Sequence, residues 1–140
     1  MTRFVYGAGG SSREHVAVVT AIYAAFARRD LEGALEHLAE DVVLWPAGTA
    51  QRLGREEPYR GHDGVRRYFA DAEEAWDELV VHARDVRAAG AGVVVFGHVD
   101  LRLGERRVVQ PVVWVWQLRG DKAVSMRVTD LGDPEERGAA

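Results

Sequence analysis

Four runs of β-forming residues in the second half of the chain constrain its fold most. They cover residues 79–88, 92–103, 106–119 and 122–131. Short segments reading AGAG, GE and GD separate them, and such Gly-containing pairs are typical of hairpin turns. Strands joined by turns this short can only pair with antiparallel neighbours. The second half of the chain therefore predicts an antiparallel meander of four strands.

The first half carries helical signals instead. Ser11 and Glu14 form a capping box, and Asp30 and Asp63 are expected to cap a second, short helix and a third helix. A short strand is predicted at residues 42–45. Apolar residues at helical spacing mark the buried stripe of the first helix: Val16, Val19, Ile22, Tyr23 and Phe26. Helices followed by a meander predict an α+β fold, with the helices packed on one face of a curved sheet.

Composition narrows the class of protein. The 140 residues fit one domain (1–140, ordered core 11–132, short flexible tails), and the net charge of −4 gives no reason to expect nucleic acid or a membrane as partner. No cysteine is present, which excludes disulfides and thiolate chemistry. Neither a signal peptide nor an apolar run long enough to span a membrane is apparent, and we expect a cytoplasmic protein.

Three stretches resemble the nuclear-transport-factor-2-like superfamily, in particular its SnoaL-like and ketosteroid-isomerase-like branch. They read RRDLEGALEHLAEDVVLW, YRGHDGVRRYF and DKAVSMRVTDLGD, and the resemblance covers residues 12–133. It implies a cone-shaped curved antiparallel sheet wrapped around three N-terminal helices, enclosing an apolar pocket. The superfamily hosts isomerases, cyclases, dehydratases, epoxide hydrolases and non-enzymes, so the fold alone does not name the activity.

The resemblance also implies which side chains line the pocket. It turns His98, Asp100 and Asp130 into the pocket as the catalytic candidates. The substrate-binding candidates are Trp45, Phe69, Phe96, Val113, Val115, Met126 and Val128. In the isomerase pattern a catalytic tyrosine falls on Ile22, the general base at Trp45 or Pro46, and the oxyanion-hole aspartate on Val113. All three are missing, so that isomerase's own machinery is not expected.

Plain alternation gives a competing interpretation of the strand at residues 92–103. It places Phe96, His98 and Asp100 on one face and the more apolar Val95, Gly97 and Val99 on the other, and the apolar face is usually the buried one. On that reading His98 and Asp100 are solvated. Likewise, Asp130 is either a third pocket carboxylate or a turn residue before Gly132.

The favoured hypothesis is a cofactor-independent acid/base enzyme acting on a small hydrophobic metabolite. Asp100 would be the general base or acid, His98 its partner and Asp130 an auxiliary carboxylate, for isomerisation, cyclisation, dehydration or epoxide opening. No metal is expected. The alternative is a non-catalytic ligand-binding or dimerisation module of the same fold. With the pocket face inward, Trp114 and Trp116 point outward, which predicts a homodimer packed through the convex sheet face.

Overall fold

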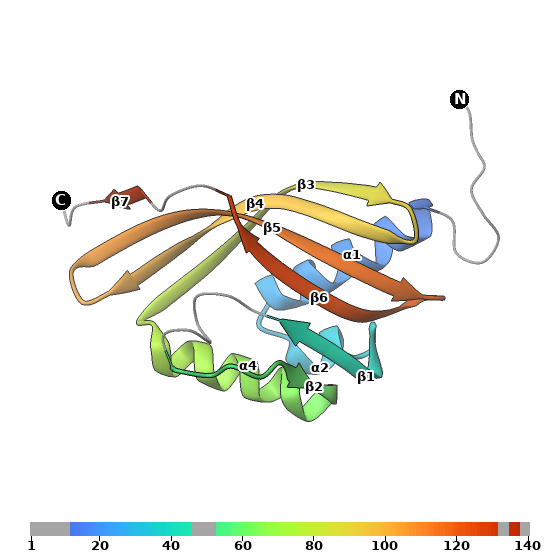
Figure 1. Cartoon of the computed structure of the whole chain (residues 1–140), viewed down its shortest axis with the longest axis horizontal. Coiled ribbons are helices and arrows are strands. Elements are labelled where there is room, and N and C mark those ends of the chain that lie inside the picture. The colour runs from blue at the N-terminus through green and yellow to red at the C-terminus, as the bar shows by residue number, and fades with distance from the viewer. Residues whose placement is uncertain (1–11, 46–52, 132–134, 138–140) are drawn as a thin grey trace.

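The computed structural model describes residues 12–45, 53–131 and 135–137 (Figure 1). Three helices are present in these ranges: α1 (Ser12–Ala27), α2 (Leu31–Leu35) and α4 (Gly61–Ala75). The strands are β1 (Leu38–Trp45), β2 (Tyr59–Arg60), β3 (Glu78–Ala89), β4 (Gly92–Leu103), β5 (Arg106–Arg119), β6 (Lys122–Asp130) and β7 (Glu135–Arg137). The predicted order of helices, early strand and four-stranded meander is confirmed.

All strands belong to one curved sheet, which is not closed. Its order is β2-β1-β6-β5-β4-β3, and the short β7 pairs with the end of β5 that extends beyond β6. The meander β3–β6 is antiparallel, but β1 runs parallel to β6. The sheet is therefore mixed, whereas an antiparallel sheet was expected. The α+β class is confirmed.

Helices α1 and α4 lie on the same side of the sheet (Figure 1). Helix α1 contacts β3, β4 and β6, while α4 contacts β1, β2 and the start of β3. We call the sheet face that they cover the inner face and the opposite one the outer face. The buried inner-face side chains are Leu44, Val93, Val95, Val112, Trp114, Trp116 and Met126.

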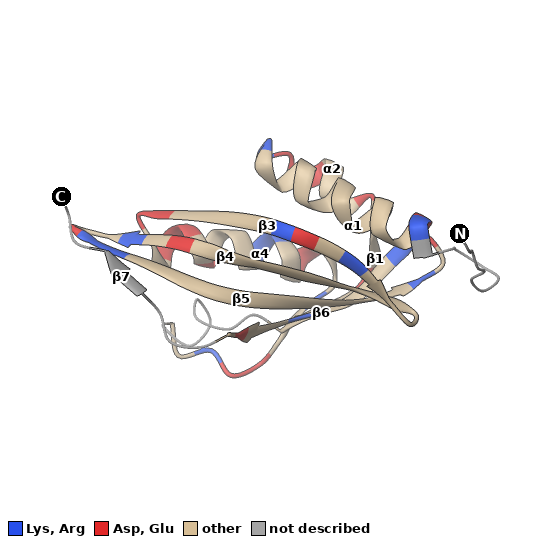
Figure 2. Ribbon diagram, turned by 90° about the horizontal axis from the view of Figure 1, so that it is seen from above, with Lys and Arg blue, Asp and Glu red and all other residues tan. Residues whose placement is uncertain are grey.

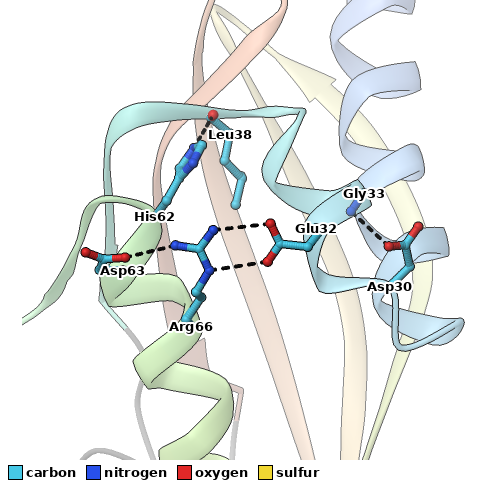
Figure 3. Close-up of polar contacts among 7 residues, drawn as sticks. All are labelled: Asp30, Glu32, Gly33, Leu38, His62, Asp63 and Arg66. Carbon is cyan, nitrogen blue, oxygen red and sulfur yellow. Dashed lines mark hydrogen bonds and ion pairs between the residues drawn. The ribbon is translucent and has the colours of Figure 1, made fainter.

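The helix starts test the predicted caps. Asp30 caps α2 by accepting a hydrogen bond from the Gly33 amide at 2.9 Å, as predicted (Figure 3). The predicted cap at Asp63 is wrong, because α4 begins at Gly61 and its N-cap residue, Arg60, makes no side-chain capping bond. Ser11 lies outside the described residues.

Arg66 joins α2 to α4. Its guanidinium donates to both carboxylate oxygens of Glu32, at 3.2 and 3.3 Å, and to Asp63 at 2.9 Å (Figure 3). Close by, a ring nitrogen of His62 lies 2.9 Å from the backbone carbonyl oxygen of Leu38, at the start of β1. The arginine pairs are exposed and contribute little stability, but together these contacts fix how α4 sits against β1.

Besides the register shift between Leu38 and Val43 in the β1–β6 pair, two β-bulges in the meander decide which side chains share a face. In the β3–β4 hairpin the pairing shifts between Ala83 and Asp85, and in the β5–β6 hairpin it shifts between Gln117 and Leu118. A one-residue shift moves every side chain beyond it to the opposite face relative to its partner strand. Both bulges matter for the sites described below.

Candidate functional site

The two tryptophans of β5 show which sheet face the helices cover. Trp114 and Trp116 are 5% and 1% exposed, and their ring centroids lie 5.7 and 5.9 Å from that of Tyr23 on α1. The prediction that they point outward to form a dimer interface is therefore wrong. Since residues directly opposite in the sheet share a face, Val93 and Val95 of β4 are inner-face residues with them.

It follows that the placement predicted for the β4 candidates is also wrong. Phe96, His98 and Asp100 alternate with Val95 and lie on the outer face, as simple alternation indicated. Phe96 is 39% exposed, and His98 and Asp100 are half-buried. The catalytic roles of His98 and Asp100 stay a prediction.

The remaining candidates divide between the two faces. Met126 and Val128 pair with Trp116 and Trp114 and lie on the inner face. The following candidates also belong there: Asp130, opposite buried Val112, and Phe69, which packs against the core from α4. The remaining three candidates lie on the outer face: Val113, Val115 and Trp45. Arg127, which is paired with Val115, stacks over the Trp45 ring there.

The bulge in the β5–β6 hairpin explains this division. A regular two-residue turn at residues 120–121 would place Val115 opposite Met126 and Val113 opposite Val128. The shift near Gln117 instead places Trp116 opposite Met126 and Trp114 opposite Val128. Nothing in the sequence of this hairpin marks the extra residue.

An aromatic cluster lies between the helices and the inner face. It consists of Tyr23, Phe26, Tyr68, Phe69, Trp114 and Trp116. Tyr23 links the tryptophans to Phe26. The ring centroids of Phe26 and Phe69 lie 4.9 Å apart, and those of Phe69 and Tyr68 lie 5.3 Å apart. The four residues that come from α1 and α4 belong to the core, yet each is only half-buried. An apolar aromatic layer that solvent still reaches is suited to binding an apolar ligand.

The polar groups of this cluster are two phenols and the indole N–H groups of the tryptophans. The Trp116 indole N–H donates to the Tyr23 hydroxyl oxygen at 3.1 Å, which leaves the hydroxyl proton of Tyr23 able to donate to another group. Burial raises the pKa of Tyr23 well above its ordinary value, although the Trp116 bond acts in the opposite direction. Burial likewise raises the pKa of Tyr68 to about 12. Both phenols are neutral donors at ordinary pH.

The inner face becomes polar at one end. Gln110 and Asp130 flank Val112 there, on β5 and β6, and Asp130 is exposed. Asp130 lies four residues beyond Met126, roughly 13 Å along the strand. The inner face thus carries a phenol at one end and a carboxylate at the other, with apolar walls between them.

A buried carboxylate on α4 has a different character. Asp71 is 4% exposed, accepts a hydrogen bond from Tyr59 at 2.5 Å, and forms ion pairs with Arg55 at 3.5 Å and Arg67 at 3.1 Å. Burial and the bond to Asp71 raise the pKa of Tyr59 to about 12. Because its charge is fully compensated, we interpret this group as the structural support that ties α4 to β2.

The outer face carries a second cluster, formed by His82, His98 and Asp100. A ring nitrogen of His82 lies 2.8 Å from an Asp100 carboxylate oxygen, and the His82 and His98 rings stack with centroids 4.3 Å apart. One ligand atom from each of the three lies within 4.8 Å of the others. Within the described part of the chain this is the group whose donors could hold a metal ion.

Sequence reasoning missed two of these residues. Tyr23 was assigned to the helical core stripe, and only its contact with Trp116 marks it as a polar group of the inner face. His82 carries no signal in the sequence, because its pairing with His98 depends on the bulge in the β3–β4 hairpin. The His82–Asp100 separation of 18 residues carries no recognisable motif.

A family model described as a SnoaL-like domain matches residues 19–126, most of the chain. No curated protein matches it significantly. Among solved structures, TerC co-crystallised with polyporic acid is 25% identical, with a TM-score of 0.76 over 84% of this chain and 92% of TerC. An NTF2-like protein of unknown function from Burkholderia pseudomallei is also 25% identical, with a TM-score of 0.75 over 84% and 91%.

Two more distant structures share the fold alone. A putative polyketide cyclase from Sinorhizobium meliloti is 16% identical, with a TM-score of 0.66 over 86% of this chain and all of that one. An LEH-like epoxide hydrolase of M. tuberculosis is 21% identical, with a TM-score of 0.62 over 85% and 84%. The family model confirms the predicted SnoaL-like family, and the solved structures confirm the predicted NTF2-like fold. In the described residues, no helix is long and apolar enough to cross a membrane.

Proposed function

Because the chain belongs to the SnoaL-like domain family, we propose that it binds a small, mostly apolar metabolite and rearranges it by cofactor-independent proton transfer. The ligand lies between helices α1 and α4 and the inner face of the sheet. The observation that carries the proposal is the half-buried aromatic cluster around a phenol whose oxygen is held by Trp116. Aromatic walls with few convergent polar groups are the usual lining of small-molecule sites.

In this proposal Tyr23 is the donor to the substrate carbonyl. Its raised pKa keeps it protonated, so it can hydrogen-bond to a carbonyl oxygen and to the negative charge that develops there. Asp130, at the other end of the inner face, takes a proton from a carbon that is conjugated with that carbonyl through the ring system of the substrate, and returns it at a new position. The balance is one proton removed and one restored, as in an isomerisation or an aldol-type cyclisation.

Two observations bear on the class of substrate. The relative TerC was co-crystallised with polyporic acid, and the cluster here presents four half-buried aromatic rings, two of them phenols, to a ligand. We therefore favour an aromatic or polycyclic carbonyl compound over an open-chain one. Epoxide opening and dehydration need the same two groups, a proton donor and a carboxylate, and are the next candidates.

Binding is tested with polyporic acid as the probe and the quenching of tryptophan fluorescence as the readout. We expect Tyr23→Phe, which removes one hydrogen bond, to weaken binding about tenfold. Asp100→Asn is the matched control on the outer face and is expected to leave binding unchanged. Wild-type protein that does not bind the probe, or binding lost equally in the control, contradicts the location of the site.

Catalysis is tested without knowing the natural substrate. Hydrogen exchange at the acidic carbon of 2-tetralone, an aromatic ketone, can be followed in D₂O by NMR. We expect the protein to accelerate exchange, Asp130→Asn to lower that acceleration by roughly 10² or more, and Asp100→Asn to retain it. Binding of the probe without any accelerated exchange would favour the alternative, a non-catalytic ligand-binding module.

The homodimer also stays a proposal, with a new set of contact residues. The tryptophans are buried, but the outer face exposes 39% of Phe96 and 39% of Val80 and carries Val113 and Val115. Charges on β4 and β5 lie toward the strand ends, and the central part of both strands is uncharged (Figure 2). A second copy of this chain is the occupant that we propose for that face.

A further inference from the structure

We propose that His82, His98 and Asp100 form a binding site for a divalent transition-metal ion, with Zn²⁺ as the reference ion. The site lies on the outer face of the sheet, on neighbouring strands β3 and β4. It is independent of the proposed inner-face chemistry, because none of the three residues belongs to the aromatic cluster.

The donor set suits such an ion. Two imidazole nitrogens and one carboxylate oxygen are the ligands that zinc and its neighbours in the first transition row accept in proteins. The three donor atoms already lie within 4.8 Å of one another, and His82 and Asp100 are separated by only 2.8 Å. Small side-chain rotations bring donors at these separations onto one ion. Three protein ligands leave at least one coordination position open to water or to another ligand.

Electrostatics around the cluster favour a cation. Asp100 supplies a negative charge, and the nearby outer-face arginines already have acidic partners: Arg87 pairs with Asp85 at 2.6 Å and Arg102 with Asp77 at 3.7 Å. The side chains of His82 and Asp100 are 38% and 31% exposed. In a single chain an ion can therefore reach the donors from solvent without any rearrangement of the sheet.

The bulge in β3 is an independent reason to regard the cluster as a built site. Pairing at the turn places Ala89 opposite Gly92, and continuing that register would place His82 opposite Val99, on the inner face. The shift between Ala83 and Asp85 instead places His82 directly opposite His98. Bulges often re-aim a side chain next to a functional site, and here the bulge creates the histidine pair.

Gly97 shows how closely the strands approach at this point. A Cβ atom there would lie 1.9 Å from the His82 carbonyl oxygen and 3.1 Å from Cζ3 of Trp114. Only glycine fits without a shift of backbone, so β3 and β4 are held together next to the cluster. The spacing of the two histidine side chains is fixed by the backbone.

The test is titration of the full chain with Zn²⁺ by calorimetry and with Co²⁺ by visible absorption. We expect one ion per chain and d–d bands typical of nitrogen and oxygen ligands. The variants His82→Gln, His98→Gln and Asp100→Asn are each expected to weaken binding at least tenfold, since loss of even an outer-shell partner weakens metal binding by roughly 10- to 100-fold. Zn²⁺ should raise the melting temperature of wild-type protein and not that of the variants.

Two matched controls separate this site from adventitious binding. His37→Gln removes a half-buried histidine from the turn before β1, and Asp85→Asn removes a carboxylate from the outer face. Both are expected to keep wild-type affinity. Circular dichroism of each variant establishes that it is folded. Absence of saturable binding, or binding that survives His82→Gln combined with His98→Gln, overturns the proposal. Inner-face probe binding by Tyr23 is unaffected in either case.

Discussion

The two faces of the sheet are built from alternate residues of the same strands, yet they have opposite characters. On the inner face the side chains of β5 are tryptophans in contact with Tyr23, and the neighbouring valines of β4 are completely buried. On the outer face β4 carries Phe96, His98 and Asp100, which are exposed or half-buried. Stability should therefore depend on the inner face, and the outer face is free to carry ligands or partners.

The largest expected effect is a loss of stability at Trp116, which we compare with the neighbouring residue of β5, Val115. Trp116→Ala opens a large cavity under α1 and should lower the free energy of unfolding by about 3–5 kcal/mol. Val115→Ala, on the outer face, should lower it by about 1 kcal/mol. Urea denaturation of the two variants measures the difference, and Trp116→Phe should recover part of the loss. Similar losses at the two positions would contradict the assignment of the faces.

The next comparison concerns two carboxylates. Asp71→Asn leaves two arginines and Tyr59 without their buried anion, and we expect a loss of about 2–3 kcal/mol. Asp100→Asn affects a half-exposed pair and should change stability by less than about 1 kcal/mol. Chemical denaturation in metal-free buffer compares them. A larger loss at Asp100 than at Asp71 would contradict the interpretation of Asp71 as the buried structural support.

A pH prediction follows from the buried phenols. Folding raises the pKa of Tyr68 to about 12, whereas the unfolded chain releases that proton near pH 10. Between these values the unfolded state binds fewer protons, so stability falls as pH rises. The slope is at most about 1.4 kcal/mol per pH unit for each such tyrosine. Tyr68→Phe should flatten the decline, as measured by urea denaturation across this range. An unchanged slope would contradict the raised pKa of Tyr68.

The smallest effect is expected at Phe96. Phe96→Thr keeps a residue suited to a strand and removes an exposed ring, so monomer stability should change by less than about 0.5 kcal/mol. If a second copy covers the outer face, the same change should weaken the dimer at least tenfold. Analytical ultracentrifugation over a range of concentrations measures this. A dimer whose affinity is unchanged in Phe96→Thr would show that the copies meet elsewhere.

Much of the fold could be predicted from local sequence signals. The hairpin turns predicted the meander, the apolar stripe predicted α1, and Asp30 predicted the start of α2. These signals work because each of these elements depends on residues that are close together in the chain. The cap of α4 was misplaced since Gly61 starts the helix earlier than Asp63. The parallel pairing of β1 with β6 joins segments about 80 residues apart, and no local signal indicates it.

The candidate site was less accessible to prediction. The resemblance to a family correctly indicated the fold. It also led to the prediction that His98 and Asp100 of β4 face the pocket, whereas simple alternation correctly placed them on the outer face. The predicted pocket lining combined Val113 and Val115, which lie on the outer face, with Met126 and Val128, which lie on the inner face. A regular register between β5 and β6 would have placed all four on one face. Tyr23 and His82 were recognised only from contacts across the tertiary structure.

The sequence by itself determined which residues of each strand lie on the same face. The period of two ties Phe96 to His98 and Asp100, and Trp114 to Trp116, whatever the rest of the chain does. Only the tertiary structure decided which face of each strand packs against the helices. It also decided which residues of neighbouring strands share that face. The physical reason is that packing of α1 against the tryptophans selects the buried face, and single-residue bulges reset the register between strands.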